Sequence, residues 1–317
     1  MDDTEMSDPD EKEEEFDNSD IVVPQTLREL PEEQKGVLEL SNPLPLDSVI
    51  DFQEEGHKYF VNGVDSRELG YKSVTTIIGA FFDHFDGDLA VRMIMRSKKH
   101  QNDPSYRYYK MSPVEIKNSW KRVTLMGSRM HANAEYYLNR LPVEDDSVEF
   151  KMFLDFMNTL PSEIKPFRTE LLVIDEEYRI AGSIDALFKN EKTGTYSLVD
   201  WKRSRDVSKK GGTWGHVPLH MLKSNNYTKY SMQLSLYRNI LERRYGLVFD
   251  SMYLVICHPV NNNFIKMDLP YLKDEVLSML EFRRLRLMAQ GVIPMPKHVA
   301  ESVEIDWEIV MEGVDFV

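Results

Sequence analysis

Cysteine is almost absent from the chain, because Cys257 is the only one among 317 residues. A single thiol cannot form an internal disulfide, a four-cysteine zinc site or an iron–sulfur cluster, so these are excluded and the chain fits a reducing compartment. The sequence also has no apolar run approaching the ~18 residues of a membrane span, which excludes an integral membrane protein. With 42% hydrophobic residues, the chain can build one or two domains with a large core.

Basic residues are scarce at the N-terminus. Residues 1–20 contain eleven Asp or Glu and one Lys, a net charge of −10, whereas the other 297 residues carry −4. Because this segment has few large apolar residues, we expect an acidic disordered tail that continues as a linker to residue 50. No Arg precedes Arg28 and no secretory apolar stretch is visible, so we expect an intracellular protein of the nucleus or cytoplasm without a mitochondrial transit peptide. The tail is either a solubilising extension or a segment that docks a protein partner or mimics DNA.

Two segments in the body of the chain are basic. Residues 92–129 contain ten Lys or Arg and two acidic residues, a net charge of +8. Residues 200–244 contain ten Lys or Arg and three acidic residues, a net charge of +7. Charge segregated in this way can form a face that binds phosphate even on an acidic protein. The alternative is that each segment is only a solvated helix surface.

The order of the predicted elements indicates an α/β fold. Ser112 and Pro113 are typical of a helix N-terminus, and runs of β-branched and aromatic residues predict strands. The predicted strands are 58–61, 169–174, 178–188, 196–202, 252–257 and 264–269, and the predicted helices are 113–138, 152–160, 230–245 and 271–290. We expect one α/β domain over residues 51–290, with a helical segment at 83–126, followed by a C-terminal tail at 291–317.

Two aspartates are predicted to lie close together on neighbouring strands. Asp185 ends the run Gly182-Ser183-Ile184-Asp185, and Asp200 begins Asp200-Trp201-Lys202. If residues 190–194 form a hairpin turn, both carboxylates reach one end of the sheet, where their repulsion favours a bound divalent cation. Alternation along the strand puts Lys202 on the same face as Asp200. Without further residues, the same pattern is also typical of charges at a sheet edge.

Two predicted helices carry polar residues at a spacing of four. Gly127, His131 and Glu135 share one stripe of their helix, and we expect close packing at the glycine to bring the histidine to the carboxylates. Gln233 and Tyr237 share a stripe of a later helix. Each set, taken alone, also fits an ordinary half-buried helix.

Together these residues resemble the RecB-like branch of the PD-(D/E)xK nuclease superfamily. The family pattern is G-x-x-x-H-x-x-x-E, then G-x-x-D, then D/E-x-K, then Q-x-x-x-Y. The chain matches it in order with Gly127, His131 and Glu135, then Gly182 and Asp185, then Asp200 and Lys202, then Gln233 and Tyr237. Residues 73–77 and Trp120 resemble upstream segments of the mitochondrial genome maintenance exonuclease group, so the resemblance covers about residues 55–270. It implies a restriction-endonuclease-like core, a central mixed sheet flanked by helices, with an N-terminal helical addition.

The resemblance also implies a role for each matched residue. The implied ligands of Mg²⁺ or Mn²⁺ are His131, Asp185, Asp200 and the carbonyl of Trp201. Lys202 would orient or deprotonate the attacking water or neutralise charge, and Gln233 and Tyr237 would position Lys202 and the phosphate. Glu135 and Glu170 would support the ligands or serve the structure alone. The DNA-binding candidates are Arg129, Trp120, Arg203 and Lys229.

The expected function is therefore that of a hydrolase that cuts DNA phosphodiester bonds. The resemblance favours an exonuclease that prefers single-stranded DNA in replication, repair or recombination. Aromatic residues among the basic ones, including Tyr108 and Trp214, could stack bases or simply pack. The alternatives are a structure-selective endonuclease and a non-catalytic nucleic-acid-binding or assembly protein on the same fold.

The charge distribution yields a first prediction. Deleting residues 1–20 removes ten net negative charges, so the truncated protein should bind single-stranded DNA more tightly at low salt. The difference should shrink as the Debye length falls below ~10 Å. Fluorescence anisotropy over a salt series measures this, and equal affinities at every salt concentration would support the solubilising interpretation.

Overall fold

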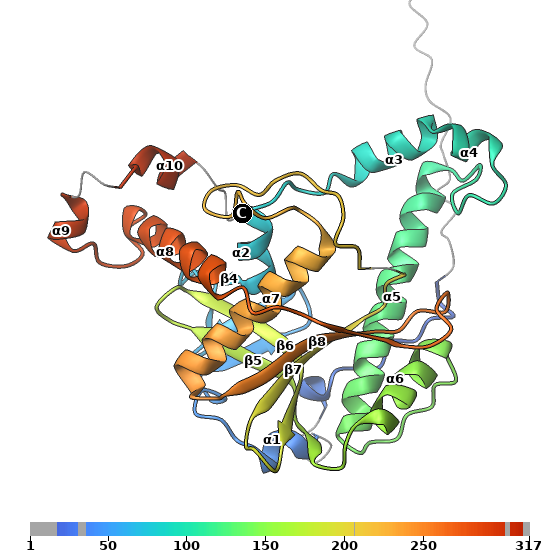
Figure 1. Ribbon diagram of the computed structural model, residues 1–317, viewed down its shortest axis with the longest axis horizontal. Helices are drawn as coiled ribbons and strands as arrows, with labels where there is room; N and C mark the ends of the chain where they lie inside the picture. Colours follow the sequence, from blue (N-terminus) through green and yellow to red (C-terminus); the bar gives the residue numbers. More distant parts are fainter. Residues whose placement is uncertain (1–17, 31–35, 206, 302–304, 313–317) are drawn as a thin grey trace, which may run out of the picture. The chain divides into compact units, whose positions relative to one another are not determined.

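The computed structural model describes residues 18–30, 36–205, 207–301 and 305–312 (Figure 1). The acidic tail predicted for residues 1–20 therefore lies almost entirely outside the described residues. The chain divides into two compact units. One, here the helical unit, contains Phe85–Arg129 and the residues before Gln25. The other, here the sheet unit, contains Gln25–His84 and the residues from Met130 onward.

The sheet unit is built on a six-stranded mixed sheet. Its strands are β4 (Lys72–Ser73), β5 (Ile164–Asp175), β6 (Ile180–Asn190), β7 (Tyr196–Lys202), β8 (Phe249–Ile256) and β9 (Ile265–Asp268). The neighbours run in the order β4-β6-β7-β8-β9, and β5 pairs with β6. The β6–β7 pair is the predicted antiparallel hairpin, closed by a hydrogen bond from the Gly194 N–H to the Asn190 carbonyl (2.8 Å). Strand β8 then pairs with β7 in parallel.

Helices cover both faces of this sheet, as predicted for an α/β fold. One face packs on the last turns of α5 (Pro113–Leu138) and on α6 (Val148–Thr159), and Trp201 is buried there against Phe153 and Phe156. The other face packs on α2 (Val74–Ala80), α7 (Asn226–Ile240) and α8 (Lys273–Ala289). A π-helical turn, η3 (Leu241–Tyr245), extends α7 to Gly246, whose φ of 68° ends the helix. Among the described residues, no helix has both the length and the apolar character needed to cross a membrane.

The segment predicted as a linker to residue 50 is instead packed on the sheet unit in its described part. It contains a 3-10 turn, η1 (Leu27–Glu29), and a short helix, α1 (Val37–Ser41). Leu27 is buried, and the buried guanidinium of Arg168 donates hydrogen bonds to the Asn42 carbonyl (3.0 Å) and to Asp47 (2.7 Å). The linker prediction was wrong here because these contacts join residues far apart in the sequence.

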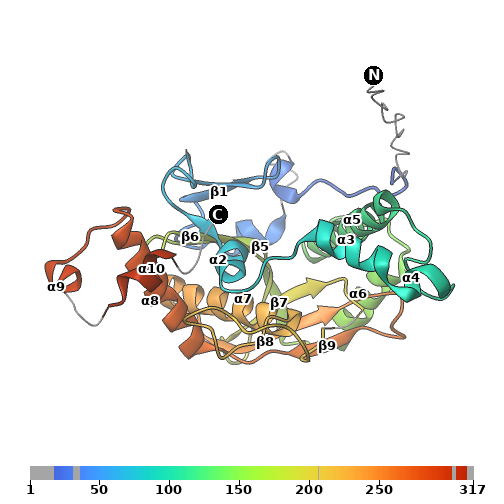
Figure 2. The same cartoon turned by 90° about the horizontal axis from the view of Figure 1, so that it is seen from above.

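A small antiparallel sheet follows this segment. Its strands are β1 (Ile50–Gln53), β2 (Lys58–Val61) and β3 (Val64–Asp65), and it lies over the ends of β5 and β6, where it packs on Ile174 and Ala181 (Figure 2). The predicted C-terminal tail likewise contains α9 (Lys297–Ala300) and α10 (Trp307–Glu312). Val310 of α10 is buried, and its carbonyl accepts a hydrogen bond from Arg286 (3.3 Å), so this part of the tail belongs to the fold.

The helical unit contains α3 (Gly87–Arg96), α4 (Lys98–Asn102) and the first turns of α5. Side chains cap each helix: Asp86 accepts from the Leu89 N–H (2.8 Å) and Ser97 from the His100 N–H (3.1 Å). At the start of α5, Ser112 and Glu115 form a reciprocal capping box. These local contacts explain why the sequence alone predicts where α5 begins.

The contact between Gly182 and α7 yields a second prediction. A Cβ on Gly182 would lie 2.7 Å from Cε1 and 2.9 Å from the hydroxyl of Tyr237, which is buried. Gly182→Ala should therefore lower the free energy of unfolding by ~1–3 kcal/mol, the cost of overpacking. Urea denaturation measures this loss.

The matched control is Gly79→Ala in α2. An added Cβ there would meet no described atom within 4 Å, and alanine favours a helix by up to ~1 kcal/mol. Its free energy of unfolding should be unchanged or higher. Equal stabilities for the two variants would contradict the packing of Tyr237 on Gly182.

Candidate metal centre

Three carboxylates lie in a row across three adjacent strands of the sheet unit. Glu170 lies between the β5–β6 pairs Thr169–Ala186 and Leu171–Ile184, and Asp200 follows Val199, which pairs with Ala186 of β6. The charge of Glu170 raises the pKa of Asp185, and the charge of Asp185 raises that of Asp200, so these carboxylates lie close enough to repel one another. A positive charge beside these carboxylates would therefore reduce their repulsion.

His131 brings an imidazole to the middle of this row. Its Nδ1 lies 3.4 Å from Oδ2 of Asp185. One ligand atom each from His131, Glu170 and Asp185 forms a group in which all atoms lie within 4.8 Å of one another. The main chain of Trp201 borders the same group: its N–H donates to Asp185 (2.9 Å) and its backbone hydrogen-bonds His131. We call these three side chains the donor group.

Asp200 has a different partner from the one predicted. Lys202 Nζ lies 2.7 Å from Asp200 Oδ2, and the two side chains are only 19% and 5% exposed. The predicted shared face of Asp200 and Lys202 is present. The donor group also contains Glu170, which the sequence placed outside the metal ligands, whereas the ligand role of Asp200 stays a prediction.

An aromatic ring covers the ammonium of Lys202. Nζ lies 4.9 Å from the ring centroid of Tyr230, a cation–π contact. The sequence motifs predict that Gln233 and Tyr237 position Lys202, and Tyr230 is not among them. The spacing in the sequence could have identified Tyr230. It precedes Gln233 by three positions and Tyr237 by seven, so it lies on the same stripe of α7.

Burial and neighbouring charges set the protonation of the site. Burial raises the pKa of Asp185 to about 7 and that of Asp200 to about 6, although Lys202 opposes both shifts. Burial also opposes the charge of Lys202, but Asp200 and Asp185 outweigh it and raise its pKa above the ordinary value. Burial and Lys202 lower the pKa of His131, so the imidazole is neutral at pH 7 with a nitrogen lone pair to donate.

The donor group fits a divalent cation. Two carboxylates and a neutral imidazole are ligands that Mg²⁺ and especially Mn²⁺ accept. Donors on opposite sides of such an ion are ~4 Å apart, so a largest spacing of 4.8 Å requires only a small side-chain shift.

The other motif residues lie around the donor group and are not part of it. Glu135 is buried, its carboxylate accepts a long hydrogen bond from the Leu27 N–H (3.4 Å), and burial together with the charge of Glu170 raises its pKa to about 8. Tyr237 hydrogen-bonds Gln233 and packs on Gly182. The close approach expected at Gly127 is not required, since a Cβ there would meet no described atom within 4 Å.

The predicted DNA-binding residues have mixed environments. Arg203 Nε lies 2.6 Å from Glu149 and both side chains are under 10% exposed, so its charge already has an internal partner. Lys229 is half-buried over the ring of Phe82 (5.6 Å). In the helical unit, Arg129 is half-buried and the Trp120 Nε1–H donates to the Tyr108 hydroxyl (2.8 Å).

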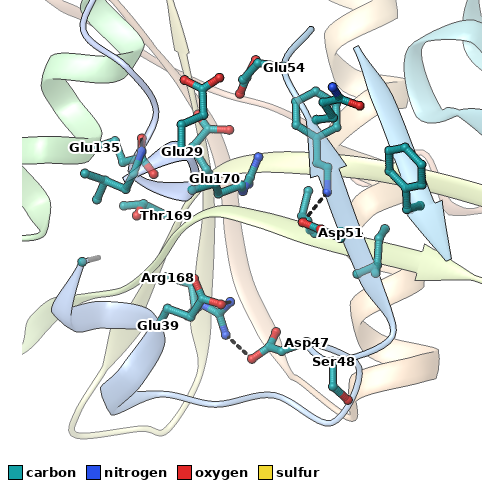
Figure 3. A pocket seen from close by; sticks show the side chains of 18 of the residues that line it. Glu29, Glu39, Asp47, Ser48, Asp51, Glu54, Glu135, Arg168, Thr169 and Glu170 are labelled. Carbon is teal, nitrogen blue, oxygen red and sulfur yellow. Dashed lines mark hydrogen bonds and ion pairs between the residues drawn. The ribbon is translucent and has the colours of Figure 1, made fainter. Parts of the chain in front are cut away.

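A cavity of about 830 Å³ adjoins the donor group through Glu170. Figure 3 shows Glu29, Glu54, Glu135 and Glu170 gathered on one side of it, with Arg168 and Asp47 paired on the other. Its many carboxylates repel phosphate, so a nucleic-acid strand needs added positive charge wherever it enters this space.

No family model matches the chain, and no curated protein matches it. The crystal structure of SSO0001 is similar over 71% of this chain and 79% of that chain, with 16% sequence identity and a TM-score of 0.30. A TM-score this low carries no argument about fold or function.

The row of carboxylates yields a third prediction. Asp185→Asn removes a repulsive charge beside Glu170 while its amide oxygen still accepts the Trp201 N–H. Without divalent ions, its free energy of unfolding should therefore exceed that of the wild type by ~1 kcal/mol, as is common when a functional charge is removed. Thermal unfolding in EDTA measures this difference.

The same variant should lose most of the stabilisation that Mn²⁺ gives the wild type, which a Mn²⁺ titration of the melting temperature records. The matched control is Asp268→Asn, a carboxylate that is 75% exposed on β9. It should change neither measurement. Equal Mn²⁺ stabilisation of wild type and Asp185→Asn would contradict the assigned donor group.

Proposed function

We propose that the chain is a metal-dependent deoxyribonuclease, an exonuclease that prefers single-stranded DNA, on a PD-(D/E)xK core of the RecB-like branch. One observation carries the proposal: a largely buried ammonium, Lys202, is paired with Asp200 on the strand beside the donor group of His131, Glu170 and Asp185. Hydrolysis of a phosphodiester needs positive charge on both sides of an anionic phosphate, and this arrangement supplies it.

The sequence motifs support the choice of substrate. The four family motifs occur in order, and the second and third lie on the neighbouring strands β6 and β7. The exonuclease mode rests on the family resemblance, and single-strand preference rests on it together with the aromatic residues among the basic ones, which could stack bases. Replication, repair and recombination are the processes that the resemblance favours.

The proposed mechanism divides the work between two groups of residues. His131, Glu170 and Asp185 would hold Mg²⁺ or Mn²⁺, which when bound would supply positive charge to a phosphate oxygen and lower the pKa of a water. Lys202, held by Asp200 on one side and by the Tyr230 ring on another, keeps its ammonium directed at the reacting phosphate, where it donates hydrogen bonds and neutralises charge. The ion pair with Asp200 stabilises the protonated form of Lys202, so these roles are favoured over removal of a proton from water.

Two alternatives predict different results with simple substrates. An end-dependent exonuclease degrades a linear single strand and leaves a circular one intact, whereas a structure-selective endonuclease cuts a circle that contains its preferred structure. A non-catalytic binding protein binds both the linear and the circular strand but cuts neither of them in Mg²⁺ or Mn²⁺. Strands labelled at the 5′ or the 3′ end report the polarity in the same assay.

The position of Lys202 yields a fourth prediction. Lys202→Ala should lower the rate of Mg²⁺-dependent cleavage of a labelled single strand by at least ~10²–10³-fold, because the charge that neutralises the phosphate is lost. DNA binding should fall only a few-fold. Circular dichroism is needed alongside, since Lys202 also balances Asp200 in the fold.

The matched control is Lys192→Ala, which removes a surface lysine whose side chain is 72% exposed and paired with Glu163. Its cleavage rate should equal that of the wild type. A Lys202→Ala protein that cuts at a near wild-type rate would show that the reacting phosphate lies elsewhere.

A further inference from the structure

Arg28 reaches the metal centre from outside the four sequence motifs. It belongs to η1, and its Nη2 donates a hydrogen bond to the Ser183 hydroxyl (3.1 Å). That hydroxyl in turn donates to Oε2 of Glu170 (2.9 Å). The guanidinium is therefore separated from the donor group by a single side-chain oxygen.

The guanidinium is held in place without an ion pair. It lies over the ring of Phe52, 5.6 Å from the centroid, and lines the 830 Å³ cavity. No carboxylate oxygen of the described residues lies within 4.0 Å of its nitrogens, and Ser183 is its one hydrogen-bond acceptor among them. An arginine has five N–H donors, so most of them remain available for a ligand.

Other arginines of the sheet unit have closer partners. Arg168 lies 2.7 Å from Asp47, Arg203 lies 2.6 Å from Glu149, and Arg243 is paired with Asp175. Arg28 lies near enough to Glu54 and Glu135 for its charge to counter the rise that burial causes in the pKa of each. It nevertheless forms a close pair with neither of them.

We propose that Arg28 binds a phosphate of the nucleic-acid strand beside the donor group. The inference rests on the proposed nuclease function and names a further residue of the same site. A guanidinium offers a planar pair of donors that matches two phosphate oxygens. It also supplies positive charge at the rim of an acidic cavity, which a bare phosphate would otherwise avoid.

The test removes the positive charge by replacing Arg28, and removes the negative charge by replacing one phosphate of the DNA with an uncharged linkage. Single-stranded oligonucleotides, each with one uncharged methylphosphonate linkage at a different position, are cleaved by wild type, Arg28→Ala and Arg28→Gln in Mg²⁺. On unmodified DNA both variants should lose about 10- to 100-fold in kcat/KM, the value of a hydrogen bond to a charged group. When the methylphosphonate replaces the contacted phosphate, the kcat/KM of the wild type should fall by the same factor. The kcat/KM of the variants should fall no further at that position.

Salt dependence provides a second readout that a purely structural role would not change. Removal of one phosphate contact should reduce the slope of log affinity against log salt by ~0.7 for a single strand. The matched control, Arg67→Ala, removes an arginine whose side chain is 61% exposed and pairs with Asp65. It should behave like the wild type on every oligonucleotide.

Two results would overturn the inference in distinguishable ways. If the wild type cuts DNA and both Arg28 variants lose the same factor at every linkage position, Arg28 is a counter-charge for the nearby carboxylates, and the nuclease proposal stands without it. If the wild type neither binds nor cuts any oligonucleotide, the nuclease proposal fails and this inference fails with it. Arg28→Gln retains a donor for Ser183, so the test holds even if Arg28→Ala folds poorly.

Discussion

Repulsion among Glu170, Asp185 and Asp200 is the constraint on which the site depends. Three neighbouring strands bring these carboxylates together, largely out of water, where Glu170 raises the cost of ionising Asp185, and Asp185 that of Asp200. Lys202 balances one end of the row through Asp200. The other end contains Glu170 and Asp185 beside His131, a neutral base, and Arg28 reaches it through the Ser183 hydroxyl, so an added cation would balance the remaining charge. The same strain that weakens the fold thus prepares the site for a metal ion.

The distribution of positive charge within the sheet unit follows from this constraint. Many basic residues between Asp200 and Arg244 are occupied by internal partners: Arg203 by Glu149, Arg243 by Asp175 and Arg244 by Glu176. The net charge of this segment therefore overstates the positive charge that it offers to a ligand. Positive charge near the donor group comes instead from single residues placed by the fold, Lys202 and Arg28.

The segment before β1 contributes residues to the site. It lies against α5 and β5, where Leu27 donates its N–H to Glu135 and Arg28 reaches Ser183. Together with β1 it forms one wall of the acidic cavity. Leu38, Leu44 and Leu46 of this segment pack on the hydrophobic clusters, and its hydrogen bonds reach buried polar groups, so the site comprises more than the four motifs.

The sequence by itself determined the features that depend on local pattern. β-Branched and aromatic residues predicted the bounds of β7, and alternation put Asp200 and Lys202 on one face, with Trp201 on the other. Ser112 as a cap, followed by Pro113, marked the start of α5. Tertiary structure decided the rest: that Glu170 joins the donor group, that Arg203 pairs with Glu149, and that Arg28 reaches the site. These outcomes depend on strand register and on contacts between segments up to 155 residues apart, and no local periodicity encodes which distant segments pair.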